Sequence, residues 1–217
     1  MKSAAEAINV NRMNHPTQTS KEFEIRALIA LLFLTNLGLL LGSVPSINLM
    51  FQPDAVATGQ WWRLAAWPFV HVSRYHLLLD ATAFLLLYTG LQESCWQTRL
   101  GYLLTTFAGS LLLPLLISPE IAQLGLCGLS GPAHGLFAIS ALELRQTDNG
   151  KKLGNLLLFL LILKTGWELI SGTALLQQFH LGDIGQPIVA THAGGMLSGL
   201  ISYHFRKKQA KQAPSSA

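Results

Sequence analysis

The chain has 217 residues, of which 50% are hydrophobic and only 12% are charged, with a formal net charge of +4. A soluble globular domain carries about twice this charged fraction, so the composition excludes an ordinary soluble protein. Two cysteines, Cys95 and Cys127, are too few for a disulfide framework.

Six apolar stretches follow one another along the chain, and each is long enough, or nearly so, to cross a bilayer as a helix of about 20 residues. They cover Ala27–Val44, His76–Leu91, Leu100–Ile117, Leu126–Leu144, Leu153–Ile170 and Ile188–Phe205. We therefore expect an all-α membrane protein in which residues 25–205 form one six-helix bundle. The flanking segments are then an N-terminal segment over 1–24 and a basic tail over 206–217.

The basic residues predict the orientation of these helices. One set of loops and ends holds Lys21, Arg26, Arg99, Arg145, Lys151, Lys152, Arg206, Lys207, Lys208 and Lys211. The other set holds only Arg63 and Arg74. Basic residues favour the cytoplasmic side, so both termini are expected there. The positive charge then indicates contact with anionic lipids of the bilayer rather than with nucleic acid.

This orientation brings the starts of three helices to the outer face. His76 and Asp80 lie at the start of the second helix, Ser130 at the start of the fourth and His192 at the start of the sixth. Helix starts carry unpaired N–H groups and a partial positive charge. Such a place is suited to stabilising an oxyanion.

Ser130 and His192 are the predicted nucleophile and base. Ser130 lies in a G-x-S-G motif that begins at Gly128, and such a motif occurs by chance in roughly one chain in fifteen of this size. The motif alone therefore proves little. A histidine at bilayer depth is costly and indicates function, although it can also be a structural residue bonded to a carbonyl. Gly195 and Gly199 form a small-residue face that lets the sixth helix approach the fourth.

Four further polar residues, His71, His76, Asp80 and His134, are expected to support this pair, together with Gly128. His76 lies one helical turn before Asp80, and its N–H can donate to an oxyanion, as can the Ser130 amide. His134 follows Ser130 by one turn and is expected to stack on His192, to hydrogen-bond it, or to bridge helices through water. A divalent metal bound by Asp80 and the histidines, including His71, is the alternative. No H-E-x-x-H or similar zinc motif is present, so we expect no metal and no other cofactor.

Two other polar features are expected to be structural. Lys164 and Glu168 stand four residues apart in the fifth helix and are expected to pair with each other. Cys127 lies near Ser130, and a packing role is expected for it.

Taken together, the order of these motifs resembles the rhomboid family of intramembrane serine proteases. The matching residues, between about Gln60 and Gly199, are Trp62-Arg63, His71, His76, Asp80, Gly128-Leu129-Ser130-Gly131, His192, Gly195 and Gly199. The resemblance implies a six-helix bundle with a Ser–His dyad in a water-filled cavity open to the outside. By this resemblance Ser130 is the nucleophile and His192 the base, and His76 and the Ser130 amide are oxyanion donors. Arg63 would anchor the first loop, and Glu93 would be a structural carboxylate.

The sequence departs from the family pattern at two places. Asp80 stands where most members have an asparagine that stabilises the oxyanion. An ionised carboxylate only accepts hydrogen bonds, so Asp80 is expected to be protonated, turned toward a histidine, or uninvolved. Of these we favour Asp80 holding His76 or His71. His134 stands where many members have a tyrosine.

The form G-x-S-G-x-x-H-G resembles the rhombosortase subfamily, whose bacterial members are thought to process secreted proteins with a C-terminal Gly-Gly, apolar helix and basic tail. The resemblance therefore implies a serine endopeptidase of the bacterial inner membrane that cleaves single-span membrane-anchored substrates near the outer face. The alternatives are a general rhomboid protease with other substrates, a non-catalytic rhomboid-like protein that binds membrane helices, and a metal-dependent membrane enzyme.

Overall fold

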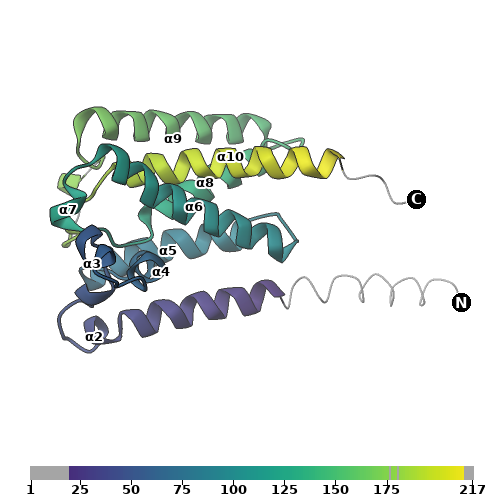
Figure 1. Ribbon diagram of the computed structural model, residues 1–217. Coiled ribbons are helices and arrows are strands. Elements are labelled where there is room, and N and C mark those ends of the chain that lie inside the picture. The colour runs from purple at the N-terminus through teal and green to yellow at the C-terminus, as the bar shows by residue number, and fades with distance from the viewer. Residues whose placement is uncertain (1–19, 176, 180, 213–217) are drawn as a thin grey trace, which may run out of the picture.

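The computed structural model describes residues 20–175, 177–179 and 181–212. These residues form a bundle of helices (Figure 1), and the β-bridge recorded among them is an isolated one between Phe51 and Leu126. The first described helix covers residues 20–35. The elements after it are α2 (Leu37–Leu40), η1 (Ile47–Leu49), α3 (Pro53–Ala57), α4 (Arg63–Ala66), η2 (Trp67–Phe69), α5 (Arg74–Gly90), α6 (Trp96–Ile117), α7 (Ile121–Leu124), α8 (Ser130–Leu144), α9 (Lys151–Ser171), η3 (Gln177–Phe179) and α10 (Ala190–Gln212).

The six expected apolar stretches correspond to helices, but the bounds of these helices differ from the prediction, and two of the differences have a clear structural cause. The first stretch is interrupted at Asn36, whose side-chain amide donates to the carbonyls of Leu32 and Phe69. The fourth stretch becomes helical only at Ser130, because the preceding residues form a loop in which Gly128 has a φ of +97°. Only glycine adopts this conformation without strain.

The number of membrane crossings is a separate question from the number of helices. Among the described residues, two helices are long and apolar enough by length and composition to span a bilayer, α6 and α9. The helix α5 has 17 residues and α8 has 15, so both fall short of the usual length. The expected count of six crossings is therefore not established by these helices alone.

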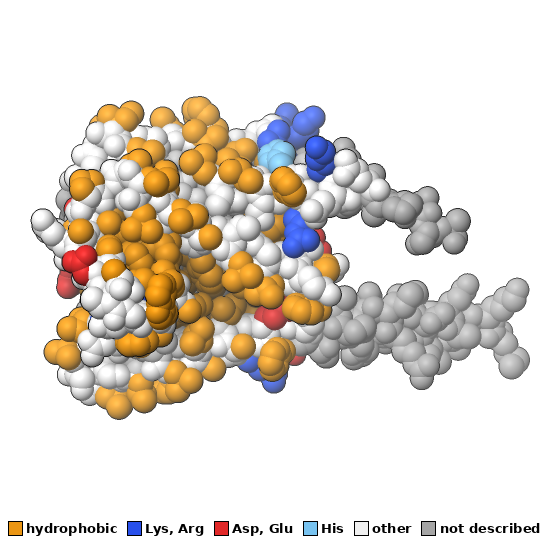
Figure 2. All heavy atoms as spheres, in the orientation of Figure 1, with side chains coloured by type: hydrophobic (Ala, Val, Ile, Leu, Met, Phe, Trp, Pro, Cys, Tyr) orange, Lys and Arg blue, Asp and Glu red, His pale blue; other side chains and the backbone are white. Residues whose placement is uncertain are grey.

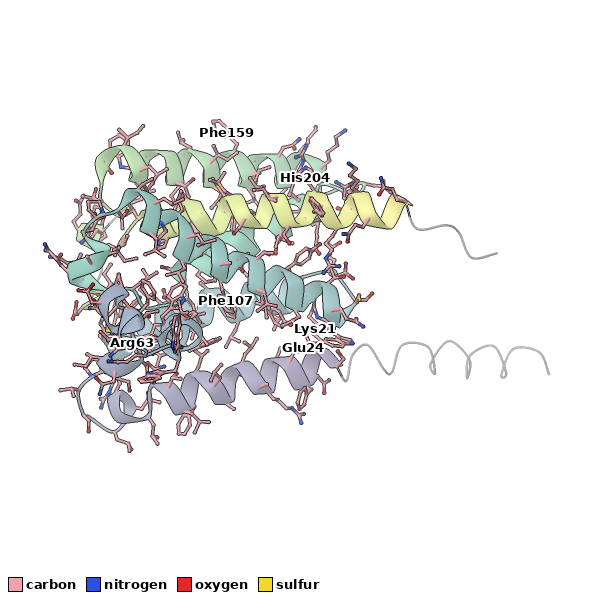
Figure 3. The ribbon with its side chains drawn as sticks, in the orientation of Figure 1. Lys21, Glu24, Arg63, Phe107, Phe159 and His204 are labelled. Atoms are coloured by element: carbon pink, nitrogen blue, oxygen red, sulfur yellow. The ribbon has the colours of Figure 1, made fainter. Side chains whose placement is uncertain are left out.

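The face of the bundle seen in Figure 2 carries many hydrophobic side chains. Exposed side chains on the long helices include Leu86, Leu116, Phe159, Ile170 and Ile201, each more than half exposed. Phe159 points away from the bundle, whereas Phe107 points into it and packs edge-on against Phe69 (Figure 3). An apolar surface of this extent is unfavourable in water and matches a lipid environment.

Basic side chains gather at one end of the bundle (Figure 2). The helix over 20–35 begins at that end, and α10 also ends there (Figure 1). The starts of α5, α8 and α10 lie toward the opposite end (Figure 1). The side chains expected to act together therefore lie far from the basic end.

The position of α10 depends on glycine contacts with α6 and α8. A Cβ on Gly195 would lie 2.0 Å from the carbonyl oxygen of Gly131, and one on Gly199 would lie 2.4 Å from that of Gly135. A Cβ on Gly194 would lie 2.1 Å from the carbonyl oxygen of Gly109 in α6. Since real Cβ atoms do not approach so closely, these helices pack backbone against backbone, as small-residue faces allow in membranes.

This packing can be tested with Gly195→Ala, because the added methyl group must push α10 away from α8. We expect the substitution to cost about 1–3 kcal/mol of unfolding free energy, the usual penalty for overpacking. Gly166→Ala is the matched control, since a Cβ at Gly166 in α9 meets nothing within 4 Å. Thermal unfolding of the purified protein in detergent measures both, and equal unfolding temperatures would contradict the packing account.

Candidate active site

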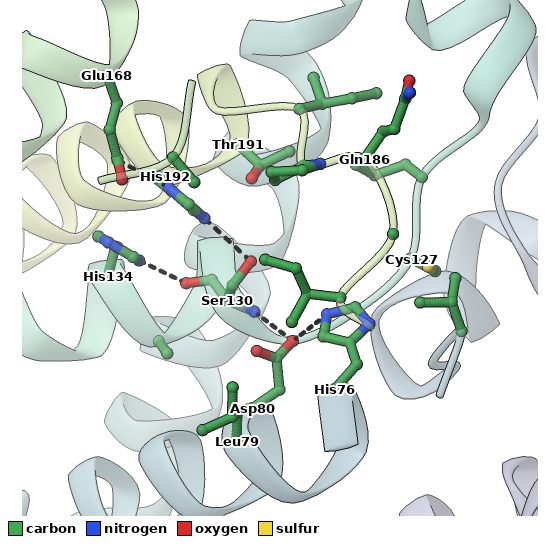
Figure 4. Close-up of a pocket in the computed structure, with 18 of the residues that line it drawn as sticks. His76, Leu79, Asp80, Cys127, Ser130, His134, Glu168, Gln186, Thr191 and His192 are labelled. Atoms are coloured by element: carbon green, nitrogen blue, oxygen red, sulfur yellow. Dashed lines mark hydrogen bonds and ion pairs between the residues drawn. The ribbon is translucent and has the colours of Figure 1, made fainter. Parts of the chain in front are cut away.

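Ser130 is the first residue of α8 and lines a cavity of about 460 Å³. The same cavity is lined by His76, Asp80, His134 and His192 (Figure 4). These residues come from α5, α8 and α10, which the bundle brings together at one end. The predicted site residues other than His71 and Gly128 thus share one cavity.

His192 lies beside Ser130. Its Nε2 is 3.1 Å from the Ser130 Oγ, a hydrogen-bond distance that links α10 to α8 (Figure 4). The imidazole is buried, whereas Ser130 is half-buried and faces the cavity. A serine hydroxyl in contact with an imidazole nitrogen is the arrangement that activates a nucleophile.

The other nitrogen of His192 contacts a carboxylate. Its Nδ1 lies 2.9 Å from Oε2 of Glu168 in α9, and Glu168 is fully buried. The second oxygen, Oε1, accepts from Lys164 Nζ at 2.6 Å and from the Leu175 N–H at 2.9 Å. The expected Lys164–Glu168 ion pair is present, but the contact of Glu168 with His192 was not expected from the sequence. The signal in the sequence that could have indicated this contact is the carboxylate itself, because a charged side chain at bilayer depth is costly and marks a functional site.

His134 stacks on His192. The ring centroids are 4.2 Å apart and the planes differ by 10°. The Nδ1 of His134 lies 2.7 Å from the Ser130 carbonyl oxygen, and its Nε2 lies 2.8 Å from Lys164 Nζ. Of the expected arrangements, stacking is the one the structure shows.

Asp80 lies on the opposite side of Ser130 from His192. Its Oδ2 accepts hydrogen bonds from the backbone N–H of Leu129 at 2.7 Å and of Ser130 at 3.0 Å. The same oxygen is 3.2 Å from His76 Nε2 and 3.6 Å from His71 Nε2. Asp80 is thus turned toward both histidines, but its shortest contacts go to the two amides.

The carboxylate therefore occupies the place where an oxyanion was expected. Both expected oxyanion donors, the Ser130 amide and His76, face Asp80 Oδ2 in this structure. Gly128 makes this approach possible, since a Cβ there would lie 2.7 Å from Asp80 Oδ2 and 2.9 Å from His76 Nε2. Gly128 therefore lets the loop before α8 approach α5 closely.

The remaining candidates make no hydrogen bond to Ser130 or His192 among the described contacts, and two of them, Arg63 and Glu93, lie outside the cavity. Arg63 Nη1 donates to the carbonyls of Ile47 and Met50, so the side chain holds the loop before α4 (Figure 3). The Glu93 carboxylate accepts from the Cys95 N–H at 2.8 Å and stabilises the turn before α6. Cys127 lines the cavity as a free thiol.

The histidines proposed as alternative metal ligands divide into two groups. Within the described residues, the set whose ligand atoms lie close enough for one ion is His134, Glu168 and His192, whose ligand atoms lie within 4.8 Å of one another. Lys164 Nζ contacts both Glu168 and His134, so an ammonium group already supplies positive charge at this place. His71, His76 and Asp80 form the other group.

The comparison with known families agrees with this geometry. The model of the Rhomboid domain matches residues 58–208, a range that contains every residue of the cavity described above except Met50. The chain belongs to the rhomboid family. Rhomboid proteins are, in general, serine proteases that act on membrane proteins, and the apolar helices of this rhomboid domain agree with a membrane location. No curated protein matches the chain significantly.

Asp80→Ala tests whether the carboxylate holds the start of α8 in this rhomboid domain. The substitution removes the acceptor of the Leu129 and Ser130 N–H groups, which costs about 1–3 kcal/mol at the buried Leu129 N–H and less at the half-buried Ser130 N–H. Asp80→Asn is the matched control, because its amide oxygen can still accept from both. We expect thermal unfolding in detergent to show a clear loss for the alanine variant and a smaller one for the asparagine variant. Equal stability of Asp80→Ala and the unmodified protein would contradict this role.

Proposed function

We propose that this rhomboid protein is an intramembrane serine endopeptidase in which Ser130 is the nucleophile and His192 the general base. The observation that carries the proposal is the 3.1 Å contact between Ser130 Oγ and His192 Nε2 on the wall of a cavity. The match of the Rhomboid domain over residues 58–208 supports the same chemistry. The two residues meet although 62 positions separate them in the chain.

The geometry supports acyl transfer by the following steps. Ser130 Oγ attacks the substrate carbonyl carbon while its proton passes to His192 Nε2. The tetrahedral intermediate then breaks its C–N bond, and the imidazolium returns that proton to the leaving amine. Water from the cavity attacks the resulting ester with His192 again as base. The carboxylic acid product leaves and the Ser130 hydroxyl is regenerated.

The oxyanion would be stabilised by groups that now face Asp80. The N–H of Ser130 and the ring of His76 converge on Asp80 Oδ2, and the developing negative oxygen needs the same donors. Two negative oxygens cannot share one set of donors without repulsion. In this proposal the Asp80 carboxylate gives way to the substrate oxygen during the reaction.

We further propose that the bundle crosses the bacterial inner membrane six times with both termini in the cytoplasm. The crossing segments are the helix over 20–35 with α2, then α5, α6, α8, α9 and α10. The basic end of the bundle then faces the cytoplasm, as positive residues favour. The short helices α5 and α8 agree with a site that lies within the membrane and is reached by water from outside.

The substrates proposed are single-span membrane-anchored proteins, with rhombosortase signals as the first candidates. The motif that runs from Gly128 through Ser130 and His134 to Gly135 supports this class. Such signals consist of Gly-Gly, an apolar helix and a basic tail. Cleavage of other membrane proteins and binding without cleavage are the alternatives.

Ser130→Ala and His192→Ala are each expected to abolish cleavage of a co-expressed reporter that ends in Gly-Gly, an apolar helix and a basic tail. Removing either member of a cooperating pair costs nearly as much as removing both, because neither acts alone. Thermal unfolding of the purified variants checks that the bundle remains folded. Near wild-type cleavage by either variant would overturn the assignment.

A second reporter with Gly-Gly replaced by Val-Val separates the rhombosortase class, which should not cut it, from a general rhomboid protease.

His76→Ala is expected to lower kcat by about 10²-fold or more, the usual loss when one oxyanion donor is removed. KM should change far less, because the donor acts mainly in the transition state. Steady-state kinetics on the same reporter in detergent measure both constants. A rise in KM with unchanged kcat would instead assign His76 to substrate binding.

A further inference from the structure

We propose that Glu168 is a positioning residue that extends the Ser130–His192 pair to a Ser–His–Glu triad, and that Lys164 sets the strength of its charge. The inference rests on the proposed protease function. Family resemblance implies a dyad of Ser130 and His192. The third residue proposed here, Glu168, comes from α9, a helix that carries neither the nucleophile nor the base. Glu168 acts through His192 and does not touch the reacting atoms.

The carboxylate of Glu168 divides its two oxygens between different tasks. Oε2 contacts His192 Nδ1 at 2.9 Å, while Oε1 accepts from Lys164 and from the Leu175 N–H. An ion pair with Lys164 alone would need only one of these oxygens. The side chain is fully buried, so its charge is costly unless every oxygen is hydrogen-bonded. The arrangement meets that requirement and fixes the direction of Oε2.

The partners of each histidine determine which ring nitrogen carries the proton. A carboxylate can only accept, so His192 must donate to Glu168 from a protonated Nδ1. Its Nε2 then has a free lone pair directed at the Ser130 hydroxyl, as a general base requires. The opposite tautomer would place two acceptors against each other at 2.9 Å. Glu168 therefore selects the reactive form of His192.

The tautomer of His134 is fixed in the same way, except that its charged partner is a donor and not an acceptor. An ammonium group can only donate, so Lys164 Nζ requires His134 Nε2 to accept. The Nδ1–H of His134 then donates to the Ser130 carbonyl oxygen at 2.7 Å. His134 is therefore a neutral ring that stacks on His192 and adds no positive charge beside it.

The charge of Glu168 also favours the step in which His192 becomes positive. When the Ser130 proton moves to His192 Nε2, the ring becomes an imidazolium with both nitrogens protonated. The adjacent carboxylate stabilises this cation and keeps its own negative charge, since the proton never passes to Glu168. Among the described residues, the charged and titratable groups facing His192 are Glu168 and Lys164 from α9 and His134 from α8. Lys164 opposes the imidazolium, and Glu168 favours it.

Opposite shifts of the pH profile follow from these opposite charges. Glu168→Gln removes the negative charge, so the imidazolium is less stable and the acid limb of kcat/KM against pH should move to lower pH. Lys164→Met removes the positive charge while the Leu175 N–H still holds Oε1, so the acid limb should move to higher pH. A purely structural role of either residue would move neither limb. Glu120→Gln, the same change at an exposed position outside the cavity, is the control.

The experiment uses the full-length protein in detergent with the cleavable reporter described above. Glu168→Gln is expected to lower kcat by about 10⁴-fold with little change in KM, the loss seen when the acid of a triad loses its charge. Glu168→Asp should recover part of this loss, because it restores the charge with a shorter side chain.

The outcomes separate failure of the triad from failure of the protease assignment. If Ser130→Ala is inactive but Glu168→Gln keeps wild-type kcat and an unmoved acid limb, the triad is wrong and the dyad stands. If Ser130→Ala still cleaves, the protease assignment itself is wrong. If Glu168→Gln does not fold, the pH profile of Lys164→Met decides, and an unmoved acid limb there overturns the proposal.

Discussion

The site depends on the backbone contact between α8 and α10. Gly131 and Gly135 in one helix face Gly195 and Gly199 in the other, at separations that leave no room for a side chain. His192 stands one helical turn before Gly195, so this contact determines how near its ring comes to Ser130. In a membrane such contacts replace the hydrophobic effect as the force that selects helix partners, because lipid is as apolar as the helices themselves.

Two buried carboxylates then flank the serine and act in opposite senses. Glu168 lies behind His192, where negative charge helps the imidazole to accept a proton. Asp80 lies on the amide side, where its negative charge competes with the oxyanion for the same donors. Each charge is tolerated only because its oxygens contact N–H groups or basic side chains. In the proposed mechanism, the serine is therefore ready to attack while its oxyanion donors are occupied by Asp80.

Sequence reasoning singled out Ser130 and His192 as a candidate nucleophile and base because their signals are local, and the structure places the two side chains 3.1 Å apart. A serine between glycines and a histidine before two glycines are visible in short motifs, and topology alone brings both to one end. The contacts of Glu168 and Asp80 have no such local signature. Glu168 reaches His192 only because α9 packs beside α10, and Lys164 offered a sufficient partner within its own helix. Asp80 reaches the amides only because Gly128 turns the loop toward α5.

The extents of the helices were predictable only in part, for a related reason. Apolar runs mark where helices can lie, but the interruption at Asn36 and the late start at Ser130 depend on hydrogen bonds to distant segments. Asn36 is held by the carbonyl of Phe69, and the Ser130 amide by Asp80. These tertiary contacts leave no trace in a hydropathy pattern. Among the described helices, α6 and α9 are long and apolar enough to span a membrane, whereas α5 and α8 are shorter than the predicted spans require.

The central claim is that the Ser130 hydroxyl is activated by His192. Mass spectrometry of the purified protein after treatment with a fluorophosphonate tests it most directly, because the reagent forms a stable adduct only with an activated nucleophile. The account predicts one phosphonyl group, located by peptide mapping on Ser130, and no adduct in His192→Ala. An adduct on another residue, or equal labelling of Ser130 without His192, would contradict it.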